Sequence, residues 1–206
     1  MKVLWRLCVL SIIIMTSFTC HAASSATNPV EPRVIIILDD LGYRKSDMAA
    51  FSLPSEVTFS ILPQTPLART ISRKAEQQGR AVMLHMPMQS TSGKAMGPLG
   101  LSTDMFPGAI THTLRAALKS VPNAVGVNNH MGSAFTVEEP AMQTIMEEIK
   151  RQGLFFVDSR TSVNTTAQQV ADRVGVPNAS RQVFLDNERS VASLNKQFEY
   201  TKRLAK

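Results

Sequence analysis

Polar residues that could bind a metal ion or move a proton stand directly after several short apolar runs of this sequence. Asp39 and Asp40 follow the run at residues 34–38, and His85 follows the run at residues 81–84. Further residues of this kind are Asn128, Asn129 and His130 after residues 124–127, Asp158 after residues 155–157, and Asp186 after Leu185. If the runs are parallel strands, their C-terminal ends share one rim, and we expect these side chains to converge there.

Two histidines and two adjacent carboxylates at equivalent strand ends suit a site for a divalent metal ion. Neutral imidazole nitrogens and a carboxylate oxygen are ligands that zinc accepts, and three protein ligands leave one position open for water. Each residue also has a simpler explanation when taken alone. Asp39 and Asp40 can belong to a turn that ends at Gly42, and His85 can be a half-buried histidine without a ligand.

Methionines near the same loops leave copper binding open as an alternative, because thioethers bind Cu(I) well. The methionines concerned are Met83, Met86, Met88, Met96, Met105 and Met131. Methionine also fills irregular gaps under long loops, and this structural role explains the residues better.

The apolar runs alternate with helical patterns, which predicts an α/β fold in which helices cover a parallel sheet. The predicted strands are residues 34–38, 57–61, 81–84, 124–127, 154–157 and 183–185. Thr65 and Pro66 predict the start of one helix, and Thr136 with Glu139 forms the pattern of a capping box at the start of another. The alternation is compatible with either a barrel or an open doubly wound sheet.

Two segments depart from this rhythm. Residues 86–108 are rich in Gly, Pro, Ser and Met and are too long for a passive connection, so we expect a functional loop or lid, with disorder as the alternative. Residues 189–206 carry an apolar helical stripe, but no strand follows them. A crossover helix without a strand to return to suggests that the sequence lacks an end of the domain.

The first residues have the pattern of an export signal. Lys2 and Arg6 precede the apolar run at residues 7–15, and small residues around Ala22 suit a signal peptidase. We therefore expect residues 1–22 to be a cleaved signal peptide and the protein to be secreted or periplasmic. An uncleaved anchor, which needs about 20 apolar residues, and a lipoprotein attached through Cys20 are the alternatives.

The remaining chain has the composition of one globular domain. We expect a flexible linker at residues 23–32 and the domain at residues 33–206. Both cysteines, Cys8 and Cys20, lie in the predicted signal, which excludes a stabilising disulfide in the mature protein. Loss of the two signal-peptide cations lowers the formal charge from +6 to +4 and leaves no basic cluster, so nucleic-acid binding is not expected. No stable membrane span is expected after cleavage.

Four blocks of the sequence together resemble a known family. They are VIIILDDLG at residues 34–42, LHMPM at 84–88, GVNNHMGS at 126–133 and FVDSRT at 156–161. In order and spacing they are similar to the successive motifs of the divergent polysaccharide deacetylase family, over essentially all of residues 33–206.

This family is distantly related to the NodB-type chitin and peptidoglycan N-deacetylases, and the resemblance implies their fold and chemistry. The fold would be a distorted, seven-stranded (β/α) barrel that holds a divalent metal ion, expected to be zinc. Asp39 would be the general base, and Asp40, His85 and His130 would be the metal ligands. The two histidines are 45 positions apart here, whereas the better-known enzymes take both from one motif with helical spacing.

The resemblance carries two further expectations. Asp158 and Arg160 would support catalysis, with Asp158 orienting Arg160 or a histidine ligand, and a structural salt bridge is the equally weighted alternative. Members of the family usually continue into a strand that ends in a Gly-His-Pro block, and this sequence ends at Lys206 without it. We therefore expect a domain truncated after its sixth strand and the following helix.

The expected function is removal of N-acetyl or O-acetyl groups from an envelope or extracellular polysaccharide by a metal-dependent hydrolase. Two other classes of protein remain open. One is a carbohydrate-binding or scaffold protein of the envelope with impaired catalysis, and the other is a periplasmic copper carrier. Metal identity and turnover distinguish the three classes.

Overall fold

The computed structural model describes residues 32–206, and residues 33–206 form one compact unit. The predicted signal peptide and most of the predicted linker lie outside the described residues. No helix in the described part of the chain is both long enough and apolar enough to cross a membrane.

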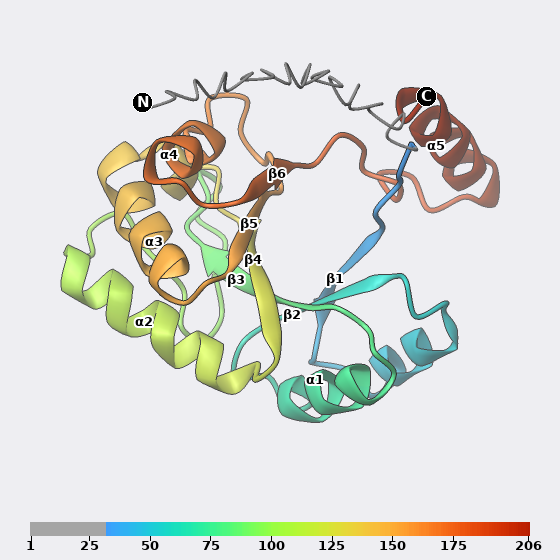
Figure 1. Cartoon of the computed structure of the whole chain (residues 1–206), viewed down its shortest axis with the longest axis horizontal. Coiled ribbons are helices and arrows are strands. Elements are labelled where there is room, and N and C mark those ends of the chain that lie inside the picture. Colours follow the sequence, from blue (N-terminus) through green and yellow to red (C-terminus); the bar gives the residue numbers. More distant parts are fainter. Residues whose placement is uncertain (1–31) are drawn as a thin grey trace, which may run out of the picture. The chain divides into compact units, whose positions relative to one another are not determined.

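Six strands form one sheet in the order β1-β2-β3-β4-β5-β6, and each is parallel to its neighbours (Figure 1). The strands are β1 Ile37–Leu41, β2 Thr58–Ile61, β3 Val82–Met88, β4 Ala124–Met131, β5 Phe155–Asp158 and β6 Asn178–Ser180. The predicted parallel α/β fold is confirmed. The described sheet is open, because β1 and β6 each pair with only one neighbour.

Helices connect the strands and cover one face of the sheet. The α-helices are α1 Ala68–Gln77, α2 Pro107–Ser120, α3 Glu139–Arg151, α4 Ala167–Val174 and α5 Val191–Leu204, and the 3-10 helices are η1 Lys45–Ser52 and η2 Phe135–Val137. Apolar residues of α1 to α4 pack with one side of the strands into a single core. No residue of α5 is buried, and this helix lies apart from α2, α3 and α4 (Figure 1).

The alternation of side chains along β3 divides the core from the site. Leu84, Met86 and Met88 are fully buried in the core under the helices. His85 lies between them in sequence and therefore points to the opposite face of the sheet, which we call the inner face. The thioethers of Met86 and Met88 thus pack away from His85, contrary to what a copper site built from this segment requires.

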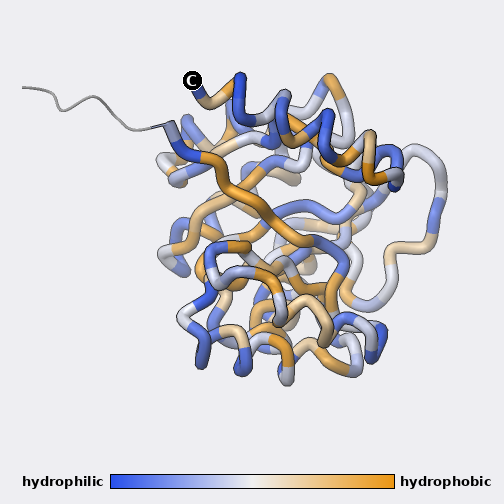
Figure 2. The backbone as a smooth tube through the Cα atoms, turned by 90° about the vertical axis from the view of Figure 1, so that its right-hand side faces the viewer, coloured by the Kyte–Doolittle hydropathy of each residue, from blue (hydrophilic) through white to orange (hydrophobic). Residues whose placement is uncertain are grey.

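The apolar residues 34–38, which lead into β1, are followed by polar residues. Figure 2 shows this stretch as an orange tube that follows the grey trace and then turns blue. The strands nevertheless extend further than their apolar runs predict. Asp39 and Asp40 belong to β1, His85 lies in the middle of β3, and Asp158 is the last residue of β5. On the inner face, His85 and Asp39 both have Asn128 as a polar partner. Asp158 shares the core side of β5 with Phe156 instead.

The sixth strand lies at a different place from the predicted one. Residues 183–185 form no strand, and β6 is instead the polar segment Asn178–Ser180. This segment pairs with β5 from Phe156 to Asp158. Backbone pairing with β5 therefore outweighs the apolar composition of residues 183–185, and Asp186 does not stand at a strand end.

Helix starts also differ in detail from the predicted ones. The predicted first helix is confirmed, but α1 begins at Ala68, and the Thr65 hydroxyl donates to the carbonyl of Leu62. The capping box predicted for Thr136 and Glu139 is wrong. Thr136 lies in η2, where its hydroxyl donates to the carbonyl of Gly132, and α3 begins three residues later.

The long segment after β3 is tied down at its base. The backbone of Gln89 pairs with Leu101, and the Gln89 carbonyl accepts hydrogen bonds from Ala134 and Phe135. The side-chain carbonyl of Gln89 accepts two more from Thr103. These hydrogen bonds argue against disorder, the alternative prediction, at the base of the segment. Residues 92–95 are exposed.

Candidate metal centre

An irregularity in β1 sets the positions of the two adjacent aspartates. Leu38 pairs with Phe59 and Leu41 with Ile61, so β1 takes three steps where β2 takes two. The extra residue makes a bulge, and Asp40 has a positive φ of 63°. A bulge redirects side chains and is common next to active sites. Here it lets two consecutive carboxylates lie near the same histidine, which a regular strand would place on opposite faces.

The two histidines reach the inner face from neighbouring strands. His85 of β3 is directly opposite Asn128 of β4 in the register, and His130 lies two residues further along β4. Residues two apart in a strand share a face, so Asn128 and His130 both point toward His85. The two imidazole rings are 4.9 Å apart between centroids and meet edge to face.

Asp40, His85 and His130 present three ligand atoms to one point. Asp40 Oδ1 lies 2.8 Å from His130 Nδ1 and 3.2 Å from His85 Nε2, and the two nitrogens are 3.2 Å apart. Ligands about 2.0–2.1 Å from a tetrahedral zinc ion are about 3.3 Å from one another. The atom types and the spacing therefore both fit a zinc-type ion. The Asp40 side chain is 65% exposed, so this group opens to solvent.

The charges in this triangle are strongly coupled. Hydrogen bonds from His130 and His85 hold the pKa of Asp40 far below its usual range, although partial burial opposes them. Burial alone would lower the pKa of His85, but its contacts with Asp40, Asp39 and Asn128 outweigh burial and raise it. Without a metal ion, a proton on His85 supplies positive charge between the carboxylates. Protons and a cation therefore compete for this group.

Asp39 lies beside the triangle and is not part of it. Its Oδ1 accepts a hydrogen bond of 2.9 Å from Asn128 Nδ2 and is 3.6 Å from His85 Nδ1. The side chain is 34% exposed, so water can reach it. A carboxylate held next to a metal-binding group and open to water has the position of a general base.

Ser60 and Asn128 complete the site. The sequence patterns placed Asn128 on the expected rim without a specific task and did not single out Ser60. Ser60 Oγ on β2 donates to Asn128 Oδ1 at 2.6 Å, and His85 Nδ1 lies 2.9 Å from the same oxygen. Both residues are almost fully buried. The signal that could have given Asn128 its task is its two-residue spacing from His130, if the predicted strand at residues 124–127 is extended through both.

Comparison with models of known protein families identifies one family. The model of the family described as divergent polysaccharide deacetylase matches residues 36–206, which includes Asp39, Asp40, His85 and His130. The chain belongs to the divergent polysaccharide deacetylase family. The family resemblance that the four sequence blocks indicated is therefore confirmed.

Two relatives of this deacetylase-family chain extend beyond the matched region. An uncharacterized protein of Haemophilus influenzae is 36% identical over 170 residues, covering 82% of this chain and 61% of the relative. Uncharacterized protein YibQ of Escherichia coli K12 is 36% identical over 175 residues, covering 84% of this chain and 55% of the relative. The chain thus spans less than two thirds of the length of these relatives.

A solved structure has the same fold. The crystal structure of uncharacterized protein ATU2773 from Agrobacterium tumefaciens C58 superposes with a TM-score of 0.81 at 26% sequence identity. The match covers 85% of this chain and 73% of that protein. The parallel α/β architecture described above is therefore that of an experimentally determined relative.

The structure does not bring Asp158 and Arg160 into contact with the metal-binding group of this deacetylase-family chain. Asp158 Oδ1 accepts from the backbone N–H of Arg160 at 2.8 Å. Within residues 32–206, no hydrogen bond or ion pair joins either side chain to Asp40 or the histidines, and no ion pair joins the two to each other. The Arg181 guanidinium donates to the carbonyls of Ser159 and Arg160 and so braces this loop.

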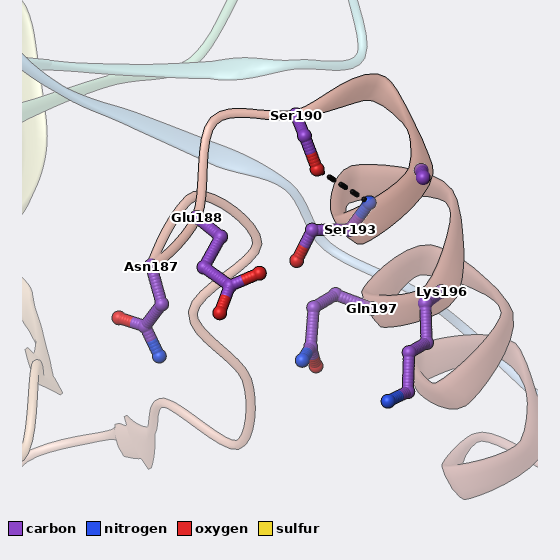
Figure 3. Close-up of a pocket in the computed structure, with 7 residues that line it drawn as sticks. Asn187, Glu188, Ser190, Ser193, Lys196 and Gln197 are labelled. Atoms are coloured by element: carbon purple, nitrogen blue, oxygen red, sulfur yellow. Dashed lines mark hydrogen bonds between the residues drawn. The ribbon is translucent and has the colours of Figure 1, made fainter.

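A separate polar cleft of about 450 Å³ lies between residues 187–190 and the start of α5 (Figure 3). Ser190 caps the helix here, because its hydroxyl oxygen accepts from the N–H of Ser193. Glu188, Lys196 and Gln197 also line the cleft. None of the aspartates or histidines of the candidate metal centre does, so the two places are distinct.

Proposed function

We propose that this chain is a metal-dependent hydrolase that removes N-acetyl or O-acetyl groups from an envelope or extracellular polysaccharide. The observation that carries the proposal is the triangle of Asp40, His85 and His130 with the Asp39 carboxylate at its side. Membership of the divergent polysaccharide deacetylase family supplies the substrate class. Hydrolysis of an acetamide needs a polarised carbonyl and a deprotonated water, and this arrangement suits both needs.

Each residue has a separate task in the proposed reaction. Asp40, His85 and His130 would hold a divalent cation, with zinc the best match to their atoms and spacing. A bound zinc ion would polarise the acetyl carbonyl and make water more acidic. Asp39 accepts the proton of the attacking water, while the hydrogen bond from Asn128 keeps its Oδ1 in place. Cleavage of the carbon–nitrogen bond yields acetate and an amine, which takes up a proton.

The proposed setting is the periplasm or the cell exterior. The N-terminal pattern of Lys2, Arg6 and the following apolar run supports export with cleavage near Ala22. A glycan is the expected partner, since the mature chain would carry a formal charge of only +4 and no basic cluster for nucleic acid.

Metal analysis and an acetate-release assay test the proposal together. The chain is expressed from Met1, purified and loaded with zinc, and its action on N-acetylglucosamine oligomers is measured. We expect one zinc ion per chain and release of acetate that depends on zinc. Binding of the oligomers without acetate release would instead support the carbohydrate-binding alternative. Tight Cu(I) binding without hydrolysis would support a copper carrier.

The variants that distinguish these outcomes follow from the geometry. His130→Ala removes one ligand atom from the triangle, and we expect it to lose zinc and activity together. His112→Ala is the matched control, since His112 is exposed on α2 and outside the triangle. Equal activity in both variants would exclude His130 as a ligand needed for catalysis.

A further inference from the structure

The side-chain amide of Asn128 connects two residues with different proposed tasks. Its Oδ1 is 2.9 Å from Nδ1 of the ligand His85, and its Nδ2 is 2.9 Å from Oδ1 of the base Asp39. The two residues are not joined directly, because His85 Nδ1 and Asp39 Oδ1 are 3.6 Å apart. Asn128 is therefore the shared neighbour of the metal ligand and the base.

Only one orientation of this amide satisfies its surroundings. A carboxylate can only accept hydrogen bonds, so the amide NH₂ group must face Asp39 and the amide oxygen must face His85. Ser60 is compatible with this orientation, because its hydroxyl then donates to Asn128 Oδ1 at 2.6 Å. Burial makes the choice strict: Ser60, His85 and Asn128 are 0%, 3% and 2% exposed, so water does not replace a missing partner.

The orientation of the amide fixes which imidazole nitrogen of His85 carries hydrogen. An amide oxygen can only accept, so His85 Nδ1 must be the donor. In the neutral ring the lone pair is then on Nε2, the atom that lies 3.2 Å from Asp40 Oδ1. The opposite tautomer would direct an N–H group at the place where a cation would sit. Partners of this kind commonly set the tautomer of metal-binding histidines.

We propose that Asn128 is a positioning residue that sets the tautomer of His85 and the orientation of Asp39 at the same time. This inference rests on the proposed function for the task of Asp39. The link to His85 stands on the hydrogen bonds alone. The neutral amide of Asn128 also lies between His85 and Asp39, so that Asp39 remains free to accept a proton from water.

Two substitutions separate the two halves of this role. Asn128→Leu removes both contacts, so Nδ1 of His85 loses its acceptor and Asp39 loses its donor. Asn128→Asp retains an oxygen for His85 and Ser60 but places a second carboxylate against Asp39. Asn129→Leu is the matched control. Asn129 is an equally buried neighbour on β4, and its amide serves the N–H of Ser159 and the carbonyl of Met131.

The first measurement is the tautomer of His85, from ring ¹⁵N chemical shifts of the metal-free protein at a pH where the ring is neutral. We expect hydrogen on Nδ1 in the parent, in Asn128→Asp and in Asn129→Leu. In Asn128→Leu we expect hydrogen on Nε2 to become prominent. Hydrogen on Nε2 of the parent would overturn the proposal, and this result does not require any variant to fold.

The second measurement is zinc affinity by competition with a chelator. Loss of an outer-shell partner weakens metal binding by about 10–100-fold. We expect that loss in Asn128→Leu and less than about threefold loss in Asn129→Leu. Unchanged affinity and tautomer in Asn128→Leu would refute the role of Asn128.

Turnover on N-acetylglucosamine oligomers adds the link to Asp39. In zinc-loaded Asn128→Asp we expect kcat to fall at least about 10-fold with little change in KM, because the disturbed group is the base and not a substrate contact. Parental kcat in this variant would refute the coupling to Asp39. If no variant or parent releases acetate while the tautomer and affinity change as expected, the proposed function fails and the positioning of His85 stands.

Discussion

Zinc should raise the melting temperature of this protein, and His85→Ala should remove most of that effect. The three ligand atoms already lie 2.8–3.2 Å from one another, so binding needs little rearrangement. A ligand that binds only the folded state stabilises it in proportion to the logarithm of its concentration over Kd. Metal binding to the folded triangle is therefore measurable as stability.

The expected size follows from this linkage. At free zinc 100 times above Kd, the folded state gains about 2.7 kcal/mol. A domain of this size melts roughly 2–4 °C higher for each kcal/mol, so we expect a rise of about 5–11 °C. If loss of His85 weakens binding about 100-fold, the gain at the same zinc concentration falls to about 0.4 kcal/mol, or about 1–2 °C.

The assay is thermal unfolding, with and without zinc, of the parent, His85→Ala and the control His112→Ala. The control should keep the full parental shift, because His112 is exposed and lies outside the triangle. A parental shift in His85→Ala would show that zinc binds elsewhere. Absence of any shift in the parent at saturating zinc would refute the fit of the triangle to this ion.

Three further predictions concern the same site and the sheet beneath it. Zinc affinity should fall as the pH is lowered, because the raised pKa of His85 lets protons bind the metal-free form in competition with the cation. Chelator competition from pH 8.5 to about 6 measures this, and a constant affinity would contradict it. Asp39→Asn should retain zinc but lower turnover by about 10²–10⁴-fold, and loss of zinc would instead make Asp39 a ligand. Gly126→Ala should reduce the free energy of unfolding by about 1–3 kcal/mol, because its Cβ would lie 2.5 Å from the Phe155 ring, and an unchanged denaturant midpoint would argue against that packing.

The sequence patterns were most reliable where the evidence is local. Apolar runs of four to eight residues between helical patterns predict a parallel sheet, because burial on both faces demands such composition. Four of the polar residues that follow those runs, Asp39, Asp40, His85 and His130, do lie together. Their convergence could be expected because parallel strands share one C-terminal rim.

Patterns of composition failed where partners distant in sequence decide the outcome. Residues 183–185 look more like a strand than Asn178–Ser180, but only the latter meets the free edge of β5. Thr136 has the sequence pattern of a helix cap, but its hydroxyl donates to the carbonyl of Gly132 instead. Asp158 follows an apolar run as the other site residues do, but its carboxylate accepts a hydrogen bond from the backbone N–H of Arg160.

By itself, the sequence determined the layered fold, the strand ends and the residue types available there, since these depend on periodicity and composition along the chain. The tertiary structure decided which atoms meet. The bulge against β2 brings Asp40 into the triangle and leaves Asp39 beside it, and the register of β3 with β4 puts Asn128 between Asp39 and His85. Register and bulges arise from pairing between segments 20 to 43 residues apart in these strands, and local sequence patterns do not specify that pairing.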